Sequence, residues 1–260
     1  MLPGVVTVRL AGSMQLIKCS WITKGENTMV VTDINLPVLG GGTIPCRAAI
    51  PDGGPSTGVV IAPTIFGINE DMNMVLERLA GEGFAAVVPN PFSRDEEPGI
   101  IGHSGEDRDR AFARLGRTPF DQAFGDMADA INDLRAKTYC NGKIAVMGFC
   151  YGGPFALVAA AKCGIQAGLS YHGSFVLDHL DAVPDVGCPL SFHWGDNDGA
   201  APLDTIDKVR ESFSTLDDAQ VFVYEGGVAH GYMLPGHGDA YNEAAAELSW
   251  ERSFELLKSI

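Results

Sequence analysis

The stretch that most constrains this chain is the hexapeptide GFCYGG at residues 148–153. An apolar run, 143–147, precedes it and an alanine-rich run, 155–161, follows it, which predicts a strand, a sharp turn and a helix. Glycines two residues before and after Cys150 let strand and helix pack closely, so the cysteine side chain is expected at the carboxyl edge of a sheet. Helix-start N–H groups there favour thiolate over thiol. The pattern therefore predicts a reactive Cys150; a small buried cysteine in a glycine-rich turn is the alternative that this motif alone leaves open.

Length and composition favour one large domain. The chain has 260 residues, of which 46% are hydrophobic, enough to bury a full core. The first convincing strand begins directly after Met29, so we expect an N-terminal extension over 1–28 and a single domain over 29–260. A net charge of -15 argues against nucleic-acid and anionic-membrane partners, because phosphate binding needs a basic surface. No apolar stretch approaches the roughly 20 residues of a membrane span.

Cysteine usage favours a reducing compartment. The six cysteines form no C-x-x-C pair and no regular spacing, so neither a zinc site nor a disulfide framework is indicated. The N-terminus lacks a clear cleavage signature, and we expect a cytoplasmic protein. No histidine motif of the H-x-x-x-H or H-E-x-x-H kind suggests a metal, and no cofactor is expected.

Alternating strand and helix patterns predict an α/β fold with a mostly parallel central sheet and helices on both faces. Strands are expected at 30–36, 45–50, 58–63, 84–89, 143–147, 165–171, 189–194 and 220–224. Helices are expected at 70–81, 120–138, 155–161, 203–213 and 241–257. The first two strands are predicted to form a hairpin. The charged stretch 90–119 is predicted to be a partly helical excursion over the sheet edge, with its charges in solvent except at Arg94.

An acid and a histidine follow the last two predicted strands. Asp198 is preferred to Asp196 because a glycine stands three residues before it and a proline four residues after it. With His230 the chain order is nucleophile, acid, histidine, as in the α/β-hydrolase scaffold. We expect His230 to take the proton of Cys150 while Asp198 fixes the imidazole tautomer. Of the other histidines, His172 and His193 are expected to be hydrogen-bonded core residues, and polar loops are expected to hold His103, His179 and His237.

From about Met29 to the C-terminus the chain resembles the dienelactone hydrolase family of α/β hydrolases. The likeness rests on the motifs above together with IFGIN at 65–69 and PNPFSR at 89–94. The resemblance implies a hydrolase of esters or lactones, with a small-molecule substrate and a Cys150-His230-Asp198 triad. It also implies an oxyanion hole from the N–H groups of Ile65 and Tyr151, and a substrate-carboxylate contact from Arg94.

Two departures from the family pattern affect the substrate side of the site. Thr64 stands where the family has a glutamate, so Cys150 must rely on His230, the helix dipole or a neighbour that the sequence does not identify. We keep Thr64 among the substrate-binding candidates. Leu234 stands where a second carboxylate-binding arginine is expected. Losing that contact forfeits roughly 1.5–3 kcal/mol, so a more apolar ester or lactone is expected.

Two other readings remain open on the sequence alone. A class I amidotransferase-like thiol enzyme also places a cysteine on a strand-helix turn, although Asp198 before the histidine argues against it. A non-catalytic protein with a redox-responsive or ligand-binding thiol would explain Thr64 as part of a decayed site. The expected oligomeric state is a monomer or a homodimer.

Overall fold

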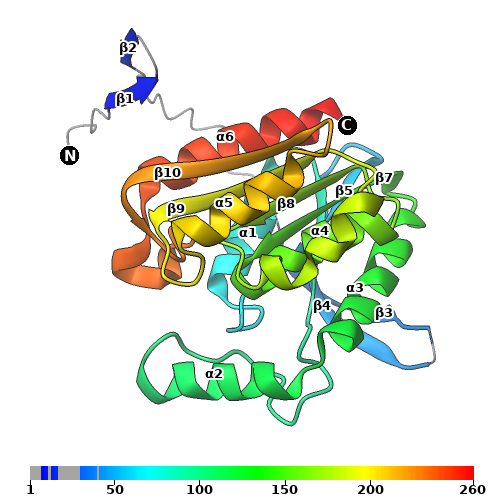
Figure 1. Ribbon diagram of the computed structural model, residues 1–260. Helices are drawn as coiled ribbons and strands as arrows, with labels where there is room; N and C mark the ends of the chain where they lie inside the picture. The colour runs from blue at the N-terminus through cyan, green and yellow to red at the C-terminus, as the bar shows by residue number, and fades with distance from the viewer. Residues whose placement is uncertain (1–6, 11–12, 17–29, 40) are drawn as a thin grey trace.

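The computed structural model describes residues 7–10, 13–16, 30–39 and 41–260. Its centre is an eight-stranded sheet with the order β10-β9-β8-β7-β5-β6-β4-β3 (Figure 1). The strands are β3 (Thr32–Pro37), β4 (Thr43–Ala49), β5 (Ser56–Ala62), β6 (Ala85–Pro89), β7 (Cys140–Phe149), β8 (Ala167–Tyr171), β9 (Leu190–Asn197) and β10 (Ala219–Ala229). Every expected strand is therefore present, with shifts of a few residues at the ends.

Most of the sheet is parallel, as the sequence predicts. All neighbouring pairs from β6 through β5 to β10 run parallel, whereas β4 pairs antiparallel with β6 and with β3. The expected hairpin is thus β3-β4 at one edge. Val59, Val60 and Ile61 of β5 are all fully buried. Such continuous burial is typical of a parallel strand covered on both faces.

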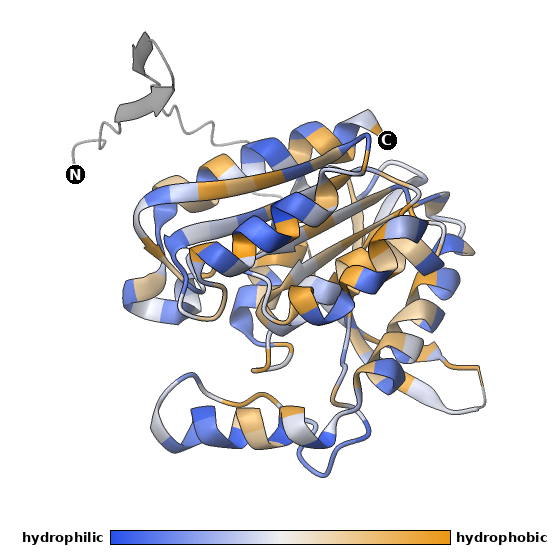
Figure 2. Cartoon of the chain, viewed as in Figure 1, coloured by the Kyte–Doolittle hydropathy of each residue, from blue (hydrophilic) through white to orange (hydrophobic). Residues whose placement is uncertain are grey.

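Helices cover both faces of the sheet (Figure 1). Those on the faces are α1 (Glu70–Gly81), α3 (Phe120–Arg135), α4 (Gly153–Lys162), α5 (Leu203–Phe213) and α6 (Glu243–Ser259), whereas α2 (Gly105–Arg117) lies apart from the sheet, at the bottom of the view. Buried residues of α3, α4 and α5 share one core cluster, and those of α1 and α6 share another, on the opposite face. Figure 2 shows hydrophobic and hydrophilic residues mixed along α5 and α6, as expected for helices with one side on a sheet.

Helix boundaries follow local caps. The helix predicted at 241–257 instead begins at Glu243, because the Asn242 side chain accepts a hydrogen bond from the N–H of Ala245. The helix predicted at 120–138 ends at Arg135. Two 3₁₀ segments, η2 (Val176–Asp185) and η3 (Pro235–Ala240), were not predicted.

The charged stretch 90–119 contains α2, so a partly helical excursion is confirmed. The expectation that its charges other than Arg94 face solvent is wrong for Arg114, whose side chain is fully buried. Burying an arginine is costly unless its donors are hydrogen-bonded, and Nη1 and Nη2 of Arg114 donate to backbone carbonyls, whereas its Nε has no partner among the described residues.

Of the predicted extension 1–28, only β1 (Thr7–Leu10) and β2 (Ser13–Leu16) are described; the rest lies outside the described residues. They pair antiparallel in a two-stranded sheet of their own. Within the described part of the chain, no helix combines the length and the apolar character needed to cross a membrane.

Candidate active site

Cys150 lies on the sharp turn that its flanking glycines predict. It follows β7 directly and opens a short 3₁₀ turn, η1 (Cys150–Gly152), that leads into α4. Its backbone is left-handed, with φ of 53°, which costs a non-glycine residue about 1–3 kcal/mol. A Cβ on Gly148 would collide with the carbonyl of Gly152, and a Cβ on Gly152 with the carbonyl of Ala62. The two glycines therefore permit the strand-helix contact that places the thiol at the carboxyl edge of the sheet.

Asp198 and His230 come together at the same edge, where β9 and β10 end. His230 Nδ1 lies 2.9 Å from Oδ1 and 3.0 Å from Oδ2 of Asp198. The N–H groups of Ala200 and Ala201 also donate to Oδ1 of Asp198. Because Nδ1 faces a carboxylate, it keeps its proton, so the other ring nitrogen is the one that gains or loses a proton.

Asp196 has a different task. Its two carboxylate oxygens accept the backbone N–H groups of Gly226, Gly227 and Val228. These bonds hold the irregular part of β10 where its register with β9 shifts. The geometry therefore distinguishes the two acids, since Asp198 contacts His230 and Asp196 supports the strand that carries it.

The thiol and the imidazole favour each other's charged forms. Burial disfavours charge on His230, but its hydrogen bonds with Asp198 and Cys150 outweigh burial and raise the pKa of His230 to about 10. Burial also opposes the Cys150 thiolate. The hydrogen bond and charge of His230, with weaker help from Ser174 and the Tyr151 N–H, nevertheless lower the pKa of Cys150 below its usual value. At neutral pH His230 is therefore an imidazolium, which favours the thiolate form of Cys150.

Ser174 is a neighbour of the thiol that the sequence did not identify. Its Oγ lies 3.8 Å from Cys150 Sγ, and its own N–H donates to the carbonyl of Cys150 at 2.9 Å. The indole N–H of Trp194 donates to the carbonyl of Gly173 and holds the same loop. Ser174 thus supplies the polar neighbour of the thiol that Thr64, in place of the family glutamate, could not be expected to supply. No local motif marks a serine 24 residues downstream of its partner.

Thr64 is buried directly after β5 and shapes the loop that follows. Its Oγ1 accepts the N–H of Phe66 at 3.3 Å. Its side chain is 1% exposed. A hydroxyl engaged in this way stabilises a turn.

Arg114 of α2 holds the peptide that follows the second expected oxyanion donor, the Ile65 N–H. Its guanidinium donates to the carbonyl of Ile65 at 2.6 Å and to the carbonyls of Glu97 and Gly99 at 2.9 and 2.5 Å. The same group lies 4.0 Å from the ring centroid of Phe92. Burial lowers the pKa of Arg114 to about 10, so it stays charged at neutral pH. Arg114 therefore fixes the backbone next to Ile65.

Arg94 is engaged with an acid of its own. Both Asp126 oxygens accept its Nε and Nη2 at 3.0 and 2.7 Å. Asp126 and Tyr151 lie in the wall of a small, mostly apolar pocket. Leu234 is buried in the core beneath α1 and α6, so it offers nothing to an anion. The described contacts do not join Arg94 to Cys150, and its charge is already compensated.

The two core histidines differ. His193 is hydrogen-bonded as expected, to Ser191 Oγ and Tyr224 OH. His172 is buried, but neither ring nitrogen has a partner among the described residues, so the expectation is wrong for it. Its ring stands edge-on to His230, with centroids 4.9 Å apart. Burial lowers the pKa of His172 well below its usual value, so it stays uncharged beside the His230 imidazolium.

The fold and this arrangement match known proteins. The family model described as the dienelactone hydrolase family matches residues 44–260. The chain belongs to the dienelactone hydrolase family. As a member it is a hydrolase with an α/β-hydrolase fold. It is 31% identical over 231 residues to the carboxymethylenebutenolidase of Pseudomonas putida, covering 88% of this chain and 97% of that protein.

Solved structures agree on the fold. A Klebsiella pneumoniae protein described as a candidate dienelactone hydrolase superposes with a TM-score of 0.79 at 23% identity, over 90% of this chain and 100% of that one. The dienelactone hydrolase-like promiscuous phosphotriesterase P91, from metagenomic libraries, gives a TM-score of 0.75 at 21% identity, over 90% and 99% of the two chains. At these identities the likeness concerns the fold.

Proposed function

We propose that this member of the family hydrolyses carboxylic esters or lactones, with Cys150 as nucleophile, His230 as base and acid, and Asp198 as the group that orients His230. One observation supports this most directly: His230 is held by both oxygens of Asp198 while its other side meets the thiol of Cys150. A bound carboxylate, an oriented imidazole and a nucleophile on a strained turn form the arrangement that activates nucleophiles in acyl transfer.

The reaction follows in two halves. The Cys150 thiolate attacks the ester carbonyl carbon, and the carbonyl electrons move to oxygen. When the oxyanion collapses, the carbon–oxygen bond to the leaving alkoxide breaks, the His230 imidazolium protonates that alkoxide, and a thioester remains on Cys150. Water then gives a proton to neutral His230 and attacks the thioester. Collapse of this second oxyanion releases the carboxylic acid and returns the thiolate and the imidazolium.

The oxyanion donors in this proposal are the N–H groups of Tyr151 and Ile65. In support of this role, the Tyr151 N–H helps to lower the pKa of Cys150, so this donor lies on the same side of the turn as the sulfur. The peptide next to the Ile65 N–H is held by Arg114. Removing one such donor typically lowers kcat by about 100-fold to 1,000-fold.

For the substrate we propose an uncharged, largely apolar ester or lactone. Arg94 is paired with Asp126, so its charge is already compensated and it attracts an anionic substrate less, and the pocket that Asp126 and Tyr151 line is mostly apolar. The activity that names the Pseudomonas putida relative, carboxymethylenebutenolidase, is therefore the reference with which turnover of apolar esters should be compared. Thr64 and Arg94 are proposed to shape this side of the site. We propose a cytoplasmic location, since the five described cysteines are free thiols. For the oligomeric state we propose a monomer or a homodimer.

The test is ester turnover by matched cysteine variants. Cys150→Ala should abolish hydrolysis of aryl esters and enol-lactones with an unchanged circular dichroism spectrum, whereas Cys163→Ala, which removes a half-buried thiol at the end of α4, should behave as the parent. Mass spectrometry of the parent with a slow ester should show one acyl group, lost in Cys150→Ala. Full activity of Cys150→Ala would refute the proposal. A reactive thiol without any ester turnover would instead favour a redox sensor, and glutamine hydrolysis would favour the amidotransferase reading.

A further inference from the structure

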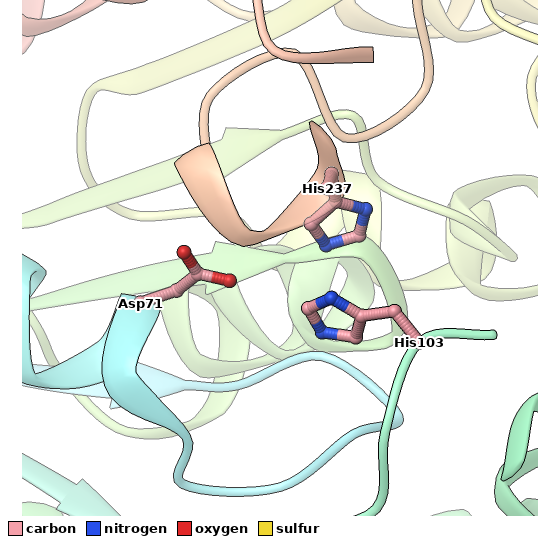
Figure 3. Close-up of side chains that lie close together, drawn as sticks. All are labelled: Asp71, His103 and His237. Atoms are coloured by element: carbon pink, nitrogen blue, oxygen red, sulfur yellow. The ribbon is translucent and has the colours of Figure 1, made fainter. Parts of the chain in front are cut away.

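Three side chains from distant segments of the chain lie close together in space (Figure 3). Asp71 lies in the first turn of α1, His103 in the loop before α2, and His237 in η3. One oxygen or nitrogen from each lies within 4.8 Å of those from the other two. The two imidazole rings are 4.7 Å apart between centroids. Two imidazoles with one carboxylate are a donor set that suits zinc and its neighbouring divalent metals.

Hydrogen bonds prepare His103 to act as a ligand. Its Nδ1 lies 2.6 Å from the carbonyl of Gly236, which can only accept, so Nδ1 carries the proton. Its Nε2 lies 3.1 Å from the amide nitrogen of Asn69, which can only donate, so Nε2 presents a lone pair. Metal sites use histidine in this form, with one N–H donated to a carbonyl and the other ring nitrogen unprotonated.

His237 offers a free nitrogen, and glycines make room for the cluster. His237 Nε2 is buried without a hydrogen-bond partner among the described residues. A Cβ on Gly231, whose φ is 88°, would collide with the His237 ring, and a Cβ on Gly236 would collide with the Asp71 carboxylate. The backbone therefore leaves space for two functional groups that would otherwise be kept apart.

The centre of the cluster already holds a weak donor. The Asn69 amide NH₂ lies between Asp71 Oδ2 and His103 Nε2, at 3.3 and 3.1 Å, while its oxygen accepts the N–H of Met72 as the cap of α1. Two acceptors from separate segments thus point at one position. A divalent cation there would interact with both far more strongly than one neutral amide does.

We propose that Asp71, His103 and His237 bind one divalent ion of the zinc class, with Asn69 turning aside to admit it. Three protein ligands leave at least one coordination position for water or another small ligand. Exposed Gly102 and Gly236 border the cluster and give access to it. Bound metal would tie α1, the loop before α2 and η3 together, independently of whether Cys150 is a catalytic residue.

The experiment titrates metal into the chelator-treated full chain carrying Cys150→Ser, so that the active-site thiol cannot bind the ion. Calorimetry with Zn²⁺ should show one ion per chain, and Co²⁺ should give the visible absorption of a low-symmetry site. His103→Ala and Asp71→Asn should each weaken Zn²⁺ binding by about tenfold or more. His179→Ala, which removes a half-buried histidine in η2, is the control and should bind as the parent does. Absence of one-to-one binding, or binding that neither ligand variant weakens, would overturn the proposal.

Asn69→Asp gives a second, opposite test. Aspartate remains a good helix cap but replaces the amide donor by a carboxylate oxygen at the centre of the cluster. Zn²⁺ should bind this variant about tenfold more tightly and raise its melting temperature more than that of the parent. If the cluster is only a hydrogen-bonded contact between segments, Asn69→Asp will melt lower, because two carboxylates face each other, and Zn²⁺ will not restore it. That result would also reject the site.

Discussion

Asp198→Asn is the sharpest test of the proposed chemistry, because the structure dictates how the new amide must sit. The N–H groups of Ala200 and Ala201 both point at Oδ1, so the asparagine oxygen will stay there. Its NH₂ then takes the position of Oδ2, which is 3.0 Å from His230 Nδ1. An NH₂ can only donate, so the Nδ1–H loses one of its two acceptors and the negative charge beside it, and keeps only a neutral oxygen at the Oδ1 position, 2.9 Å away.

The magnitude follows from what this change removes. Without the carboxylate, His230 is a weaker base toward the thiol and toward water and its tautomer is held less firmly, and general-base catalysis of this kind contributes about 100-fold to 10,000-fold. We therefore expect kcat of Asp198→Asn to fall by that factor with little change in KM, because Asp198 does not touch substrate. The Cys150 pKa should rise, since the imidazolium that stabilises the thiolate is weakened.

Two measurements check this prediction. Steady-state hydrolysis of an uncharged aryl ester gives kcat and KM, and the rate of alkylation by iodoacetamide against pH gives the thiol pKa. Asp204→Asn, an exposed acid in the first turn of α5, is the matched control and should leave both unchanged. A loss below about tenfold for Asp198→Asn, with an unshifted thiol pKa, would refute the reasoning about His230.

Three further predictions concern the neighbours of the thiol. Ser174→Ala removes a hydrogen bond to sulfur, so alkylation against pH should show a higher Cys150 pKa, by up to about one unit for a bond of roughly 1 kcal/mol; an unchanged profile would contradict this. Arg114→Met leaves buried carbonyls unpaired and should lower the free energy of unfolding by about 2–5 kcal/mol in urea melts. Its kcat should also fall, because the backbone at Ile65 is held less firmly. Stability equal to that of the parent would be inconsistent with these contacts. In the parent, the alkylation rate of Cys150 against pH should rise at a lower pH than that of an ordinary thiol, because His230 lowers the pKa of Cys150. Acylation should decline as pH rises through about 10, where the His230 imidazolium that protonates the leaving group is lost. An alkylation profile that rises only near pH 9, as for an ordinary thiol, would contradict the pairing of the two groups.

Local sequence patterns determined the frame of this protein. The buried strands are continuous apolar runs and the helices repeat their apolar residues at helical spacing, so both could be predicted from neighbours in the chain. The turn at Cys150 could be predicted because its glycines stand two residues away on either side. The order of Cys150, Asp198 and His230 sufficed to bring them to one edge, because parallel strands end on the same side of a sheet.

Tertiary packing alone decided the contacts that tune this frame. Ser174 reaches Cys150 across 24 residues, and Arg114 reaches the carbonyl of Ile65 across 49. Asp126 compensates Arg94 across 32 residues, so a charge expected to meet substrate meets an acid of the chain instead. None of these partners is marked by spacing, because a hydrogen bond or ion pair between distant segments depends on how the loops fold over the sheet edge. Local sequence thus determined the strand end at which each reactive group lies, whereas the packing of the loops determined its protonation equilibrium and its neighbours.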